Sequence, residues 1–171
     1  VVIFSSAVFA DWDPTHPAKW VQLPDLDPTG IDVLATSPIV LADDFQCLST
    51  GPITDIHLWG SWLHDFLPIN SQGLPDASSL SFRLSIHSDI PSGPTQDYSM
   101  PGQLLWQKYF KPGEFATRLY KSNLIEGFYD PTQGQYIMPG DSKVWQYNFL
   151  INPTDAFIQK GTTAQPITYW L

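Results

Sequence analysis

The chain has 171 residues, of which 43% are hydrophobic and 14% aromatic, and its net charge is −9. This composition excludes a disordered chain, which is poor in aromatic and β-branched residues, and the length fits one domain with its own core. The acidic balance argues against nucleic acid or an anionic membrane as partner, because both require a basic patch. The single cysteine, Cys47, provides no disulfide framework, and we expect it to be a small buried residue on a strand.

Proline and glycine are spread along the whole chain, with 16 Pro and 11 Gly. Long helices do not tolerate prolines at this spacing, whereas short strands joined by turns do. Most of the acidic residues are Asp, which favours turns and caps, rather than Glu, which favours helices. We therefore predict an all-β fold, an antiparallel β-sandwich.

The chain begins with an apolar segment, VVIFSSAVFA at residues 1–10. An apolar run closed by small residues is typical of the end of a secretory signal, with cleavage before Asp11, and it is too short to span a bilayer. The alternative is a strand that packs in its own domain or is exchanged with a neighbouring copy. Residues 11–36 are rich in Pro and Asp and are expected to be an extended lead-in, which leaves 37–171 as the β-sandwich domain.

The clearest predicted strand covers residues 53–63. Apolar residues at positions 56 and 58 alternate with a polar face that carries Asp55, His57 and Trp59. Alternation with a period of two is the signature of a strand that is buried on one side. This polar face is therefore expected to be accessible.

Further strands are predicted from short apolar runs between turn residues. Leu84 and Ile86 alternate with polar residues in a second half-buried strand. The other predicted strands cover residues 39–47, 104–110, 115–120, 135–138, 144–151 and 167–171. Residues 155–160 are expected to form a short helical turn, with Thr154 as its cap and Gly161 after its end.

Aromatic residues are the most informative feature for binding. Trp and Tyr stack on sugar rings when they are exposed, although most aromatic residues of a sheet protein belong to its core. Trp59, with Asp55 and His57 on its face, is the first exception that we expect. Tyr98 is the second, and with Asp97 it lies in the long loop 88–102. Long loops in compact domains are often functional. These five residues form the predicted ligand-binding surface.

No residue is assigned a catalytic role. A His beside a carboxylate can act as an acid or base, but no Ser or Cys nucleophile in a triad context accompanies His57 and Asp55. A glycosidase needs two carboxylates across a cleft, and the only glutamates, Glu114 and Glu126, stand in turn-like contexts. We therefore expect the protein not to be an enzyme.

Calcium is the one metal that the sequence leaves open, and no other cofactor is expected. Asp43, Asp44 and Asp89 are the candidate oxygen ligands. For Asp43 or Asp44, a structural role in which the carboxylate accepts backbone or Trp hydrogen bonds is the stronger interpretation. A second acidic stretch at 25–32 has the spacing D-x-D-x-x-G-x-D. It is similar to a calcium loop, but a turn formed by Asp and Pro explains it better. The scattered histidines do not favour zinc.

Four short motifs together resemble a known group of domains: LADDFQC, ITDIHLWGSW, FRLSIHSD and MPGQLLWQ. The chain resembles uncharacterised secreted bacterial domains that often precede a PEP-CTERM sorting tail. The matching residues are Ala42, Asp43, Asp44, Phe45, Trp59, Gly60, Phe82, Ile86, Asp89, Pro101, Gly102, Leu104 and Leu105, with YWL at 169–171. The resemblance implies a jelly-roll-like sandwich on an exported protein, and it supplies no activity.

The sequence thus predicts an extracellular or cell-surface protein without a transmembrane segment. We expect a non-enzymatic binding or adhesion module whose partner is a polysaccharide. The first alternative is a structural subunit whose partners are neighbouring copies of itself, joined through residues 1–10. The second alternative is a hydrolase or lyase that acts on polysaccharide.

Overall fold

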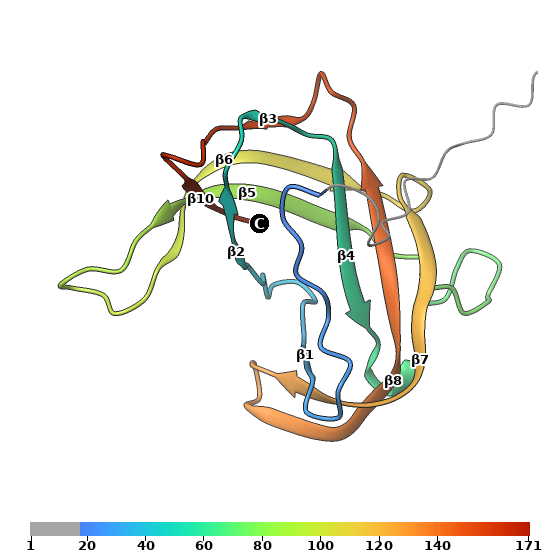
Figure 1. Cartoon of the computed structure of the whole chain (residues 1–171). Helices are drawn as coiled ribbons and strands as arrows, with labels where there is room; N and C mark the ends of the chain where they lie inside the picture. The colour runs from blue at the N-terminus through green and yellow to red at the C-terminus, as the bar shows by residue number, and fades with distance from the viewer. Residues whose placement is uncertain (1–17) are drawn as a thin grey trace, which may run out of the picture.

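Two four-stranded sheets form the body of this computed structural model, which describes residues 18–171 (Figure 1). In spatial order, the first sheet contains β1 (Ile31–Val33), β7 (Ala116–Asp130), β8 (Gln135–Leu150) and β4 (Asp55–Ser61). The second contains β2 (Asp44–Cys47), β10 (Ile167–Trp170), β5 (Phe82–Ile90) and β6 (Met100–Phe110). A separate ladder pairs β3 (Gly51–Ile53) with β9 (Phe157–Gln159). The fold is the predicted all-β sandwich, and within 18–171 no helix is long and apolar enough to cross a membrane.

Aromatic side chains from both sheets form the main core. Phe149 of β8 has no solvent exposure, and its ring centroid lies 4.9 Å from that of Phe110, 5.0 Å from Phe82 and 5.4 Å from Phe115. Ile56 of β4 is buried in the same core, on the apolar face that the alternation predicts. Because these residues belong to both sheets, their burial holds the sandwich together.

Cys47 belongs to a second, smaller core with Ile86 and Tyr169. Its side chain is buried, and its thiol donates to Gln159 Oε1 at 2.7 Å. Burial raises the pKa of the thiol to about 11, although Lys19 partly opposes this. A thiol that stays protonated is a poor nucleophile, so the prediction of a structural buried cysteine is confirmed.

The structure changes several predicted boundaries. Residues 157–159 form β9, in which Ile158 pairs with Pro52, so the predicted helical turn is wrong. The two strands predicted at 135–138 and 144–151 are one continuous strand, β8, and β7 extends ten residues beyond the predicted end at 120. The lead-in also contributes to the sheet, because its β1 pairs in parallel with β7.

Three register shifts interrupt the antiparallel pairing of β7 with β8, and the last two compensate each other. From Ser122 to Glu126, β7 advances four residues while β8 advances two, from Lys143 to Asp141. The next paired step is reversed, with two residues along β7 and four along β8. Bulges re-aim the side chains beside them. They leave Glu126 and Asp141 directly opposite each other across the ladder.

Candidate functional site

A groove of about 1080 Å³ lies between the lead-in, β2 and β4. In Figure 1 the lead-in, drawn in blue, runs between these two strands. The lead-in supplies the lining residues 18–25, β2 and its approach supply 43–45, and β4 supplies 55–60. Trp20, on the lead-in, is 50% exposed and is one of the residues that line this space. We call this feature the groove.

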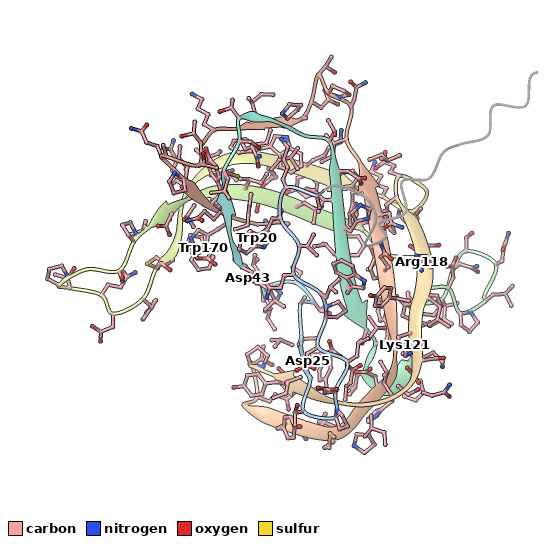
Figure 2. All side chains as sticks on the ribbon, viewed as in Figure 1. Trp20, Asp25, Asp43, Arg118, Lys121 and Trp170 are labelled. Carbon is pink, nitrogen blue, oxygen red and sulfur yellow. The ribbon has the colours of Figure 1, made fainter. Side chains whose placement is uncertain are left out.

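The groove is acidic. Six carboxylates line it, and they come from Asp25, Asp32, Asp43, Asp44, Asp55 and Glu126. Lys19 is the one Lys or Arg among its lining residues, and its ammonium group donates to the carbonyl of Pro52 at 3.0 Å. Figure 2 shows Arg118 and Lys121 toward the right of the view, whereas Trp20 and Asp43 lie near its centre. The potential inside the groove is therefore negative.

Three of the five predicted binding residues, Asp55, His57 and Trp59, line the groove. His57 Nε2 lies 3.2 Å from Asp55 Oδ2, and its Nδ1 lies 2.6 Å from Asn148 Oδ1. Trp59 packs edge-on against Tyr120, with 5.8 Å between the ring centroids. Contacts with β7 and β8 thus hold these side chains in fixed positions along one wall.

Asp97 and Tyr98 lie elsewhere, on the loop between β5 and β6. Tyr98 is 67% exposed, and neither residue lines the groove. Figure 1 shows this loop projecting away from the rest of the chain. The structure therefore does not bring the five predicted binding residues together at one surface.

Most of the described tryptophans have structural partners. The indole N–H groups of Trp62, Trp106 and Trp170 donate to Tyr147 Oη, to the carbonyl of Asp155 and to Asp89 Oδ1, at 3.1, 2.7 and 2.8 Å. Within residues 18–171, Trp20 is the one tryptophan with an exposed side chain. The most exposed tryptophan among the described residues is thus one that the sequence pattern did not single out.

The three acids predicted to bind calcium do not form one site in the structure. Asp89 accepts the Trp170 indole, and Asp43 accepts the backbone N–H of Asp44 at 2.9 Å. Asp43 and Asp44 are both exposed, so neither points inward as expected, although Asp43 does accept a backbone hydrogen bond. Together with Asp89 they do not form a group with the spacing of metal ligands.

A different set of acids does form such a group. Oxygen atoms of Asp32, Glu126 and Asp141, one from each, all lie within 4.8 Å of one another. Glu126 is 2% exposed and Asp141 is 5% exposed. Among residues 18–171, no hydrogen-bond donor reaches Glu126 Oε2, Asp32 Oδ2 or either carboxylate oxygen of Asp141. We call these three residues the carboxylate cluster.

Three strands position the carboxylate cluster. Glu126 and Asp141 are opposite each other on β7 and β8, and Asp32 lies on β1, whose parallel pairing begins beside them with Ile31 opposite Gly127. The approach requires a glycine at position 30. A Cβ atom there would lie 2.8 Å from the carbonyl oxygen of Asp25 and 3.3 Å from Glu126 Oε1. The carbonyl oxygen of Asp25 and Glu126 Oε1 therefore both lie close to the position that this Cβ atom would occupy.

Burial and mutual repulsion raise the pKa values of the cluster. Burial raises the pKa of Glu126 to about 7, and the negative charges of Asp32 and Asp25 add to the effect. The pKa of Asp141 is raised to about 8, first by burial and then by Asp32, with smaller contributions from Glu126 and Asp65. Crowded carboxylates cannot all ionise unless a positive charge joins them.

The sequence pattern predicted only part of this arrangement. The spacing D-x-D-x-x-G-x-D contains Asp32 and Gly30, and the turn interpretation is supported by the bond from Gly30 N–H to the carbonyl of Asp27 at 2.8 Å. Glu126 was assigned to a turn-like context but lies inside β7. No local signal joins Glu126 to Asp141, because their contact depends on the register of two long strands.

The fold and the groove together define an all-β sandwich domain with an acidic groove that adjoins buried carboxylates. The chain belongs to the family described as domain of unknown function DUF7901, whose family model matches residues 18–171. No curated protein and no solved structure matches the chain. The family description does not mention a sorting tail, so the resemblance to domains that precede PEP-CTERM tails stays a prediction.

Proposed function

We propose that this domain is a secreted, non-enzymatic binding module whose groove holds a segment of a neutral polysaccharide. The observation that carries the proposal is the exposed ring of Trp20 in a groove lined by carboxylates. Exposed aromatic rings provide stacking surfaces for sugars, and ionised carboxylates accept hydrogen bonds from hydroxyl groups. Sites of this kind join an apolar surface to a few fixed polar groups.

The charge of the groove narrows the class of polysaccharide. Asp43, Asp44 and Asp55 line the same space as Trp20, and the single lysine there already contacts a backbone carbonyl. Uronic acid or sulfated chains would meet like charge, which costs free energy on binding. Neutral chains, which present only hydroxyl groups, avoid this cost.

The carboxylate cluster does not favour a polysaccharide hydrolase. Hydrolysis needs an acid and a second carboxylate on either side of a glycosidic bond that lies between them. Glu126 and Asp141, the two acids with raised pKa values, are 2% and 5% exposed. A sugar ring cannot enter between side chains that are so deeply buried. Binding without hydrolysis is the function that this geometry supports best.

Affinity electrophoresis tests the proposal. The protein is run through gels that contain neutral polysaccharides (xylan, glucomannan, mixed-linkage β-glucan, hydroxyethyl cellulose) or acidic ones (alginate, polygalacturonate). We expect retardation in at least one neutral gel and none in the acidic gels. Trp20→Ala should raise the Kd about tenfold, which corresponds to about 1.4 kcal/mol for one stacked ring.

Tyr98→Ala is the matched control, because it removes an aromatic ring that is at least as exposed but lies outside the groove. Its Kd should stay within twofold of the unmodified protein. Lack of retardation in every neutral gel would contradict the proposal. If Tyr98→Ala lost binding and Trp20→Ala kept it, the binding site would lie on the loop between β5 and β6 instead of in the groove.

A further inference from the structure

The carboxylate cluster holds more negative charge than its surroundings compensate. Glu126 Oε2 and both carboxylate oxygens of Asp141 are buried, and they receive no hydrogen bond from the part of the chain that the structure describes. Within residues 18–171, no Lys or Arg forms an ion pair with Asp32, Glu126 or Asp141. A buried, unpaired carboxylate is very unfavourable, so such groups either take up protons or bind a cation.

The donor set selects the type of cation. Every ligand atom in the cluster is a carboxylate oxygen, and His and Cys are absent from the group. Oxygen ligands favour hard cations, whereas imidazole and thiolate ligands favour zinc and other softer metals. The carbonyl oxygen of Asp25, which flanks the same point beside Gly30 as Glu126 Oε1, is a further neutral oxygen next to the cluster.

We propose that Asp32, Glu126 and Asp141 bind one calcium ion. Calcium takes six to eight oxygen ligands, including bidentate carboxylates and backbone carbonyls, in flexible geometries, which suits three carboxylates beside a carbonyl-rich turn. Magnesium demands an octahedral shell and keeps several of its waters, which a buried cluster does not accommodate. Within the described part of the chain, all three residues carry an unpartnered buried oxygen, and one oxygen atom from each lies within 4.8 Å of the others.

The position of the ion gives it a structural role. It would join β1 to β7 and β8, at the end of the groove where Asp32 and Glu126 contribute to the lining. β1 pairs with the first sheet through three residue pairs only. Because residue 20 precedes β1 by about ten positions on the same lead-in, the ion would support the wall that carries Trp20.

Calorimetry on the 171-residue chain, freed of metal with EDTA and then returned to buffer at pH 7.5, tests the proposal without any polysaccharide. Titration with CaCl2 should show one site per chain. At a calcium concentration of 100 Kd, the Tm should rise by about 5 to 10 °C. MgCl2 at the same concentration should give a smaller shift. An equal or larger shift with magnesium would overturn the choice of calcium.

Glu126→Gln and Asp141→Asn each replace a carboxylate by an amide of the same size. Both should abolish the calcium-induced shift, while their Tm in EDTA stays at or above that of the unmodified protein, because a buried charge is removed. Asp44→Asn is the matched control, since it changes an exposed acid of the groove in the same way. It should keep the full shift.

No heat and no Tm change at 10 mM CaCl2 would overturn the proposal. So would a shift that survives in both cluster variants, or one that Asp44→Asn abolishes to the same extent, because binding would then be diffuse. None of these outcomes depends on the polysaccharide proposal, which is tested separately in gels.

Discussion

Calcium-free protein should lose stability as the pH rises, and Glu126 allows the size of this effect to be worked out. Its pKa is about 7 in the folded chain, against an ordinary value of 4.5. A raised carboxyl pKa means that the folded state binds the proton more tightly than the unfolded state does. Folding therefore carries no penalty below pH 4.5, and the full penalty is present above pH 7.

The size of this stability loss is set by the difference between the pKa of Glu126 in the folded chain and its ordinary value. At about 1.4 kcal/mol per pH unit, it corresponds to about 3 kcal/mol of lost unfolding free energy. For a chain of this size, this equals a fall in Tm of about 6 to 12 °C. Asp141, whose pKa is raised to about 8, acts in the same direction and extends the loss to higher pH.

Urea unfolding in EDTA, followed by tryptophan fluorescence at pH 5, 6, 7 and 8, measures this loss. The unmodified protein and Asp44→Asn should lose stability together across the series. Glu126→Gln, which cannot ionise, should show a markedly shallower fall. An unfolding free energy that is constant or rises from pH 5 to 7, or an identical slope in Glu126→Gln, would refute the reasoning about the cluster.

Three further predictions concern the fold. Phe149→Ala should lower the unfolding free energy by about 3 to 5 kcal/mol in urea titrations, because it removes a fully buried ring that contacts three others; a loss below 1 kcal/mol would contradict this core. Gly140→Ala should cost more than about 1 kcal/mol, since its Cβ would lie 2.7 Å from the backbone nitrogen of Phe128; a neutral effect in thermal unfolding would show that β8 can shift there. Cys47 should not react with a thiol reagent such as DTNB at pH 8 until urea unfolds the chain, because it is buried and its pKa is about 11. Rapid labelling of the folded protein would contradict that prediction.

The period-2 pattern predicted the strands best where the pairing is regular. Ile56 is buried as the alternation requires, and β4 and β5 lie where they were expected. β7 was predicted to end at 120 because its pattern fails where the bulge inserts two residues, and Asn123 there has a φ of 61°. Local alternation cannot reveal a strand whose register shifts along its length.

Other differences arise where a local signal competes with distant pairing. Thr154 and Gly161 are correct start and stop residues for a helix, yet β9 forms between them because it pairs with β3 about a hundred residues earlier. Pro139 and Gly140 are residues that normally end strands, and β8 nevertheless continues through them. Tertiary pairing overrides propensity at both places.

The candidate site was predictable only where its residues follow a local pattern along one strand. Asp55, His57 and Trp59 alternate on one strand, and all three are among the lining residues of the groove, as are Ile56 and Leu58 from the opposite face of β4. Trp20 stands in a segment without periodicity, so no pattern indicated that its ring would be exposed there. The carboxylate cluster joins β1 to two consecutive strands that come much later in the chain, and its formation depends on the register of β7 with β8.

The central claim is that Trp20 forms part of the ligand site, and NMR of the indole N–H resonances tests it most directly. A 15N-labelled sample is titrated with an oligosaccharide of the neutral polysaccharide that retards the protein, and Trp20→Ala assigns its resonance. We expect the Trp20 indole resonance to shift until it saturates, while the resonances of Trp62, Trp106 and Trp170, whose indoles donate to protein oxygens, change little. A titration that leaves the Trp20 resonance unchanged while the backbone amide of Tyr98 shifts would contradict the claim.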